Sequence, residues 1–217
     1  MEKLKLETRY TAAVVSTEAE AEAENTITGR PIVYASPTDI GGWFREVIAP
    51  GALDGADLSD VRLCLNHDTG YVYARARKGS AVNTMEIEPN EYGLDFSAQL
   101  SDAPAARDLF AAVSRGDISG MSFMFTVKED SWADLDTDYP TRTIKQIGTV
   151  IEISAVTFPA YEATTINARD GKEALESARA AVETARSQTA APEESGDKSA
   201  EDELELAKAK ARLHFTL

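Results

Sequence analysis

Alternation of apolar and polar residues predicts β-strands along much of this chain. Alternation typical of strands with one buried face occurs in three segments, residues 4–10, 71–77 and 93–100. Residues 61–67 and 149–158 contain longer apolar runs, which are typical of more deeply buried strands. The acidic alternation of residues 18–24 lacks β-branched and aromatic side chains, so we expect a mobile loop there.

One segment between these strands has helical character. Residues 101–117 begin with polar side chains, carry Pro104 in the first turn and end at Gly116. The helix is expected to bury three apolar residues, Leu109, Phe110 and Val113. Strands before and after it must pair around it. The predicted fold is therefore α+β and mainly β, a curved sheet or closed β-barrel packed with helices, including one central helix.

Composition changes near Arg169 and predicts a boundary there. From residue 170 to residue 217, Ala, Glu, Lys and Ser dominate, which predicts an acidic tail that is helical or partly disordered. Residues 171–187 and 201–213 read as helices, and the stretch between them reads as a linker. The interpretation is a domain of residues 1–169 followed by a solvated helical appendage, with a coiled-coil or scaffold-docking element as the alternative.

Charge and residue usage exclude several classes of function. The chain has 22 Lys and Arg against 37 Asp and Glu, a net charge of -15, which argues against direct nucleic-acid binding. Cys64 is the single cysteine, so no internal disulfide is expected. No secretory signal or apolar run long enough for a membrane span is visible, which predicts an intracellular protein without membrane contact. No metal or cofactor is expected, because neither zinc-ligand spacing nor a phosphate-binding glycine loop occurs.

Two residues have the local settings that nucleophilic catalysis requires. His67 follows an apolar strand and precedes a polar loop. Such a position fixes the backbone of the residue and leaves the imidazole accessible to a substrate. Ser122 lies in a segment opened by Gly116 and Gly120, where the backbone can turn and leave amides facing an oxyanion. Local pattern alone favours structural roles for both residues, so the assignment needs a second line of support.

Four motifs provide that support. The segments GWFREVIAPGAL, LCLNHD, RGDISGMSFMF and EISAVTFPAYEAT resemble, in order and spacing, the prohead maturation serine proteases of tailed bacteriophages, the HK97-type family. The resemblance covers residues 26–169. It implies that His67 and Ser122 are the catalytic pair, and that the fold is related to the herpesvirus assembly proteases. Met124 stands where the family commonly has glycine, which is expected to narrow or reshape the substrate cleft.

A third catalytic member is expected to be a carboxylate. The herpesvirus enzymes orient the catalytic histidine with a second histidine, and none is available before the tail, where His214 lies. Glu152 is the best candidate, because a carboxylate among apolar neighbours is costly to bury without a partner such as the imidazole Nδ1. A solvent-facing Glu152 is the alternative. Asp68 is the rival, but on an extended chain it should face away from His67 and shape the loop instead.

The resemblance implies acyl transfer on proteins of an immature viral shell. Ser122 is expected to attack a peptide carbonyl, with backbone amides near it or near Arg142 as oxyanion donors. The implied substrates are extensions of the major capsid protein, scaffold segments and the protease itself, inside the procapsid in the host cytoplasm. The chain is expected to require no cofactor, and homo-oligomers are possible.

Two other functions compete with this interpretation. A catalytically silent scaffold or assembly protein would act through its helical tail, although intact His67 and Ser122 argue against it. A thiol hydrolase would use Cys64, but a strand cysteine with apolar neighbours is usually inert, and alternation should turn it away from His67.

Overall fold

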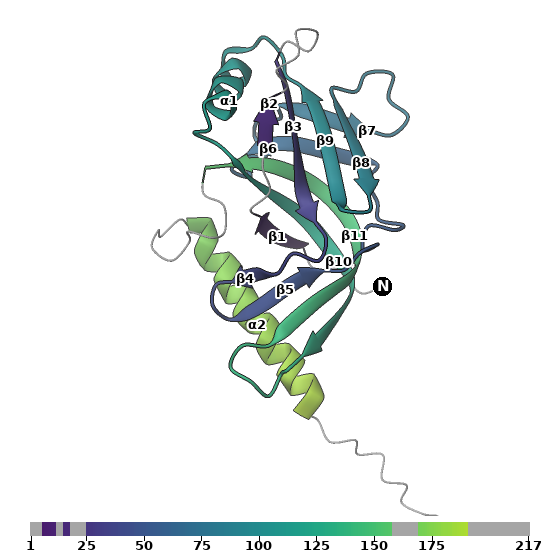
Figure 1. The fold of residues 1–217 in the computed structure, drawn as a ribbon, viewed down its shortest axis with the longest axis vertical. Helices are drawn as coiled ribbons and strands as arrows, with labels where there is room; N and C mark the ends of the chain where they lie inside the picture. The colour runs from purple at the N-terminus through teal and green to yellow at the C-terminus, as the bar shows by residue number, and fades with distance from the viewer. Residues whose placement is uncertain (1–5, 12–14, 18–24, 158–168, 191–217) are drawn as a thin grey trace, which may run out of the picture. The chain divides into compact units, whose positions relative to one another are not determined.

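The computed structural model describes residues 6–11, 15–17, 25–157 and 169–190. Its elements follow one another as β1 (Leu6–Thr11), β2 (Val15–Thr17), β3 (Thr26–Val33), β4 (Thr38–Ile40), β5 (Phe44–Ile48), β6 (Asp60–Leu65), β7 (Ala74–Arg77), β8 (Met85–Asn90), β9 (Gly93–Gln99), α1 (Pro104–Ser114), β10 (Gly120–Ala133), β11 (Thr141–Val156) and α2 (Arg169–Ala190) (Figure 1). The mainly β, α+β prediction is confirmed.

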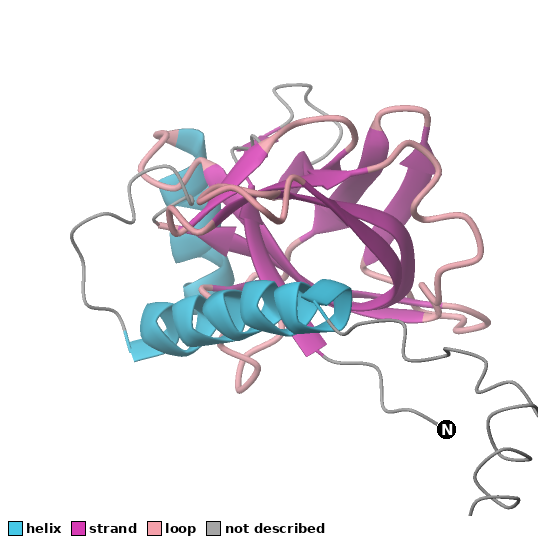
Figure 2. Ribbon diagram, turned by 90° about the horizontal axis from the view of Figure 1, so that it is seen from below, coloured by secondary structure: helices cyan, strands magenta, loops and turns pink. Residues whose placement is uncertain are grey.

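The strands form two sheets. The larger has seven strands, with the path β1-β10-β11-β5-β4 and with β6 paired to β11 and β7 paired to β6. The smaller has four strands in the order β2-β3-β9-β8. Figure 2 shows these strands in magenta, curving past one another. Among the described residues the pairings leave the two sheets open, so the closed barrel considered from the sequence is not formed.

The long hairpin of β10 and β11 organises the larger sheet. Register shifts interrupt its pairing between Met124 and Asp130, and such bulges bend and twist a strand pair. β11 then pairs in parallel with β5 through residues 141–144 and with β6 through residues 152–155. β11 therefore pairs with two different strands along its length, with β5 near its start and with β6 near its end.

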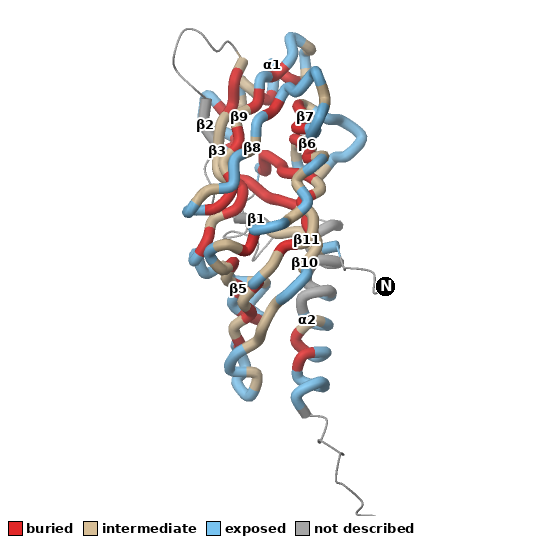
Figure 3. The backbone as a smooth tube through the Cα atoms, turned by 90° about the vertical axis from the view of Figure 1, so that its right-hand side faces the viewer, coloured by how far each residue is buried: buried red, intermediate tan, exposed pale blue. Residues whose placement is uncertain are grey.

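Both sheets contribute to one hydrophobic core. Ile32 and Leu94 enter it from the smaller sheet, and Leu63, Phe123 and Ile153 from the larger one, all without exposed surface. Figure 3 shows these buried stretches in red along the strands. The alternation read from the sequence arises because each strand turns one face toward this core.

Helix α1 covers one end of the core instead of occupying its centre. It contacts β2 and β3 and buries Ala106, Leu109 and Val113. Phe110, expected to be fully buried, is only partly so. The helix begins with Pro104 at its first position after Ala103, and Gly116 beyond its end has a φ of 79°. The predicted helix is confirmed, but its central position is not.

Helix α2 forms where the tail was expected to be helical. Its Val182 is buried and packs on Phe44, and the Arg179 guanidinium lies 5.3 Å from the centre of the Trp43 ring. The chain divides into two compact units, Met1–Ala185 and Arg186–Leu217, and this division falls inside α2.

The remaining tail predictions, including the linker and the second helix, lie outside the described residues, as does the acidic loop of residues 18–24. No helix in the described part of the chain is long and apolar enough to cross a membrane.

Candidate active site

A tight turn after β6 positions His67. The strand ends at Leu65, and Asn66 and His67 both have left-handed backbone conformations, with φ of 50° and 61°. Each such conformation costs a non-glycine residue about 1–2 kcal/mol and persists only where other contacts hold it. The Asn66 Oδ1 accepts a hydrogen bond of 3.0 Å from the Thr157 amide, and the Asn66 amide donates to the Ala155 carbonyl at 2.9 Å. The turn is therefore tied to the end of β11.

Ser122 lies near the start of β10. It is opposite Ser154 of β11 on one side and Tyr10 of β1 on the other. Directly opposed residues of antiparallel strands turn their side chains to the same face, so the Ser122 and Ser154 hydroxyls are neighbours. Ser122 has no exposed surface, and its hydroxyl donates a 2.8 Å hydrogen bond to the backbone carbonyl of Arg9.

Glu152 is fully buried on β11 and contacts His67 directly. The imidazole Nδ1 lies 2.5 Å from Oε1, and the Ser154 hydroxyl donates to Oε2 at 2.6 Å. A carboxylate without exposed surface requires such hydrogen bonds, because burial without them is costly. The solvent-facing alternative for Glu152 is therefore wrong.

Ser154 connects the predicted site residues. Its Oγ accepts a 3.1 Å hydrogen bond from the His67 backbone amide, and the same hydroxyl donates a hydrogen bond to Glu152. Since Ser154 is also the direct cross-strand neighbour of Ser122, the structure brings Ser122, His67 and Glu152 to one face of the larger sheet. Sequence reasoning missed Ser154, because a serine within an apolar strand carries no distinctive local signal.

Cys64 lies beside the same carboxylate. It is opposite Ser154 in the parallel β6–β11 pair, and burial raises its pKa to about 12, reinforced by the negative charge of Glu152. The prediction that Cys64 faces away from the His67 side is wrong, because the left-handed turn at Asn66 and His67 breaks the strand alternation. The raised pKa keeps the sulfur as a thiol, which disfavours it as a nucleophile.

Asp68 shapes the loop after His67. Its Oδ1 accepts a 2.9 Å hydrogen bond from the Gly70 amide, and its own amide donates to the Leu65 carbonyl at 3.0 Å. The chain is in a turn here and not extended, so the expected reason for its orientation was wrong. Its hydrogen bonds nevertheless go to the loop, as predicted.

A buried network of charges extends from β1 into the larger sheet. Arg9 pairs with Glu46, through Nη2 and Oε2 at 2.8 Å, and Glu7 accepts two hydrogen bonds from Arg142 at 2.6 and 3.0 Å. Arg142 also contacts Glu46 at 3.1 Å and Asp130 at 2.5 Å. Glu46 and Arg142 are only 3% and 5% exposed.

Arg142 lies on β11 and not in a loop, and carboxylates hold its side chain in this network. The suggestion that backbone amides near it are oxyanion donors stays a prediction. The network was not predicted, because its members lie on four separate strands.

Met124 is half-buried between β1 and β11, where it is opposite both Thr8 and Glu152. Residues two apart on a strand share a face, so its side chain lies on the same face as Ser122. A side chain therefore fills space there that a glycine would leave open.

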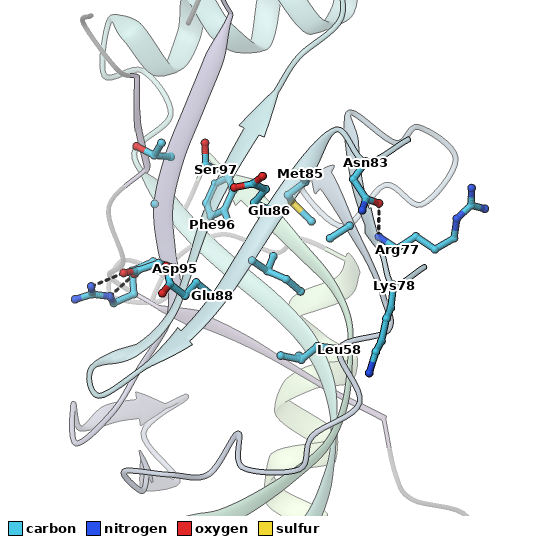
Figure 4. A pocket seen from close by; sticks show the side chains of 15 residues that line it. Leu58, Arg77, Lys78, Asn83, Met85, Glu86, Glu88, Asp95, Phe96 and Ser97 are labelled. Atoms are coloured by element: carbon cyan, nitrogen blue, oxygen red, sulfur yellow. Dashed lines mark hydrogen bonds and ion pairs between the residues drawn. The ribbon is translucent and has the colours of Figure 1, made fainter. Parts of the chain in front are cut away.

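A hollow of about 980 Å³ lies elsewhere, between β8 and β9 on one side and the end of β7 on the other. Figure 4 shows its charged rim, including Arg77, Lys78, Glu86 and Glu88. Ser122, His67 and Glu152 do not line it. No group of three or more metal-ligating side chains occurs among the described residues.

Comparison with known proteins identifies the family. The family model of the caudovirus prohead serine proteases matches residues 12–177. The prohead protease of Enterobacteria phage HK97 is 31% identical over 150 residues, which cover 67% of this chain and 62% of that protein. The chain thus spans less than two thirds of the length of this relative. No solved structure matches significantly. The resemblance seen in the motifs is confirmed, and the chain belongs to the caudovirus prohead serine protease family.

Proposed function

We propose that the protein is a serine endopeptidase with Ser122 as nucleophile, His67 as general base and Glu152 as the residue that orients His67. The observation that supports it most is the hydrogen bond between His67 Nδ1 and Glu152 of β11, with Ser122 on the neighbouring strand β10. An ionised carboxylate only accepts hydrogen bonds, so Nδ1 carries the proton and Nε2 is the basic nitrogen. This is the tautomer that general-base catalysis requires.

The reaction is acyl transfer in two steps. The Ser122 hydroxyl turns from the Arg9 carbonyl toward His67 Nε2 and gives up its proton as Oγ attacks the peptide carbonyl. The buried carboxylate of Glu152 stabilises the imidazolium that forms, and His67 then protonates the leaving amine. Water repeats the sequence on the acyl-enzyme and releases Ser122.

The proposed substrates are proteins of the immature viral shell, namely extensions of the major capsid protein, scaffold segments and the protease itself. Family membership supports this assignment. The proposed location is the interior of the procapsid in the host cytoplasm, where confinement gives a high effective concentration and lets weak intrinsic affinity suffice.

Co-expression with the neighbouring capsid protein tests the proposal. Wild type and Ser131→Ala are expected to produce the same capsid fragments by mass spectrometry, whereas Ser122→Ala produces none. Ser131 is a matched control, because it lies on the same strand as Ser122 but opposite Thr143 instead of Ser154. An unchanged fragment pattern with Ser122→Ala would overturn the assignment.

A further inference from the structure

The N-terminal strand β1 covers the edge of β10 next to Ser122. The two strands pair antiparallel over six residues, from Leu6 opposite Thr126 to Thr11 opposite Met121. β1 is the last strand on this side of the sheet, so β10 would present an open edge without it (Figure 1). An open edge is the surface to which an extended peptide adds as a further strand.

The backbone of β1 also accepts a hydrogen bond from the proposed nucleophile, Ser122. The Ser122 hydroxyl donates to the Arg9 carbonyl at 2.8 Å, across a separation of 113 residues along the chain. A substrate must bring a peptide carbonyl to this hydroxyl before it can be attacked. β1 therefore places a peptide group where the proposed function requires one, and Ser122 is completely covered in this arrangement.

Side chains of β1 supply the specificity of this contact. Glu7 and Arg9 are two residues apart, so they point to the same face and enter the buried charge network together. Arg9 binds Glu46 through two nitrogens, and Glu7 binds Arg142 through both carboxylate oxygens. Paired two-point contacts of this kind fix geometry as well as charge.

We propose that the edge of β10, with Glu46 and Arg142 behind it, is the substrate-binding strand of the site and that β1 is its intramolecular occupant. The edge takes extended peptides with a basic residue at the position of Arg9, whose carbonyl meets Ser122, and an acidic residue two positions before it. This inference rests on the proposed function, because it takes Ser122 as the nucleophile.

The charges that remain when β1 leaves agree with this occupant. Glu46, Asp130 and Arg142 then carry a net charge of -1, with Glu46 still bonded to Arg142. β1 brings one negative charge, Glu7, and one positive charge, Arg9, so the net charge is the same with and without it. A peptide with a cation next to Glu46 and a carboxylate next to Arg142 re-forms the two ion pairs that Arg9 and Glu7 make.

The rate at which a fluorophosphonate modifies Ser122 in the full-length protein tests whether β1 covers the site. Arg9→Gln removes the charge that pairs with Glu46, so its labelling is expected to be at least about tenfold faster than in wild type. Arg30→Gln is the matched control, because Arg30 forms a two-nitrogen pair with Asp95 on the other sheet. It should be labelled at the wild-type rate. Glu7→Gln is a second variant with the same expected direction as Arg9→Gln.

Capped peptides test the charge pattern. LETRYT, the sequence of β1, is expected to slow labelling of Arg9→Gln, whereas LRTEYT, with the two charges exchanged, leaves it unchanged. Equal slowing by both peptides overturns the proposed specificity. Equal labelling of wild type and both β1 variants, including no labelling of any, overturns the proposal that β1 covers Ser122.

Labelling and cleavage by Ser122→Ala distinguish a wrong occupant of the edge from a wrong nucleophile. If Ser122→Ala abolishes labelling while β1 variants behave as wild type, only the occupancy of the edge is wrong. If Ser122→Ala is labelled as fast as wild type and still cleaves capsid protein, the proposed function itself is wrong.

Discussion

The imidazole of His67 and the carboxylate of Glu152 are joined by a 2.5 Å hydrogen bond, although 85 residues separate them in the sequence. Parallel pairing of β6 with β11 creates this contact, since it brings the end of β6 alongside residues 152–155. The fully buried carboxylate is also bonded to Ser154, so it cannot turn away from the ring without losing a second hydrogen bond.

Glu152→Gln is expected to lower kcat by about 10²- to 10⁴-fold with little change in KM, because an amide cannot stabilise the imidazolium. Steady-state kinetics on a capsid-derived peptide measures this, with circular dichroism to verify the fold. Glu129→Gln, an exposed change on β10, should leave both constants unchanged.

Adding Glu152→Gln to His67→Ala should cost little beyond His67→Ala alone, because the two residues act as one unit. If the two substitutions instead lower the rate by independent factors that multiply, the catalytic site consists of Ser122 and His67 alone.

Cys64→Ala is expected to keep near wild-type activity and to lower stability by at most about 1–2 kcal/mol. Because burial raises the pKa of the thiol to about 12, iodoacetamide should modify it slowly in the folded protein and rapidly in urea. Intact-mass measurements follow the reaction. Inactivity of a folded Cys64→Ala protein would favour the thiol-hydrolase alternative.

Glu7 should make stability depend on pH below neutrality. Burial alone would raise its pKa, but the hydrogen bond from Arg142 and the charges of Arg9 and Arg142 outweigh burial and hold the pKa below the ordinary value of 4.5. A lowered pKa means that this carboxylate stabilises the fold above about pH 4.5 and that the stabilisation is lost as pH falls through the lower, folded-state pKa.

Urea unfolding should therefore show Glu7→Gln to be about 1–3 kcal/mol less stable than wild type at pH 7, with the difference shrinking toward pH 3. A difference that stays constant over this range would show that the pair with Arg142 is not what stabilises β1. Glu129→Gln again serves as the exposed control.

Gly93→Ala is expected to destabilise the smaller sheet by more than about 3 kcal/mol. Gly93 has a φ of 149°, and an added Cβ would lie 1.8 Å from the Ile32 carbonyl oxygen. Gly79→Ala has a positive φ but open space, so it should cost only about 1 kcal/mol. Similar unfolding midpoints for the two variants would contradict the close approach of β3 and β9.

The sequence predicts best those features that depend on neighbouring residues. β9 spans Gly93–Gln99 almost as the alternation indicates, and β6 ends just before the polar residues that surround His67. The strand predicted over residues 71–77 is only partly confirmed, because only Ala74–Arg77 form a strand. The apolar run around Glu152 indicated burial, and burial required a partner.

Features that depend on distant pairing could not be predicted. Nothing in residues 4–10 specifies that this strand lies beside β10, because any edge with matching alternation offers the same hydrogen bonds. The pairing of Arg9 with Glu46 arises only after that choice. The prediction of which side Cys64 faces was wrong for a different reason. The left-handed residues Asn66 and His67 interrupt a periodicity that assumes extended backbone.

The pairing of β1 with β10 also has a consequence for how the chain folds. β1 is synthesised before β10, which follows more than a hundred residues later, and closing so long a loop is entropically slow. Folding is therefore expected to pass through a form in which the hairpin of β10 and β11 exists and β10 still lacks its neighbour. During that interval, newly made copies present a bare strand edge to one another, and crowding them in one place favours intermolecular pairing over the slower intramolecular closure.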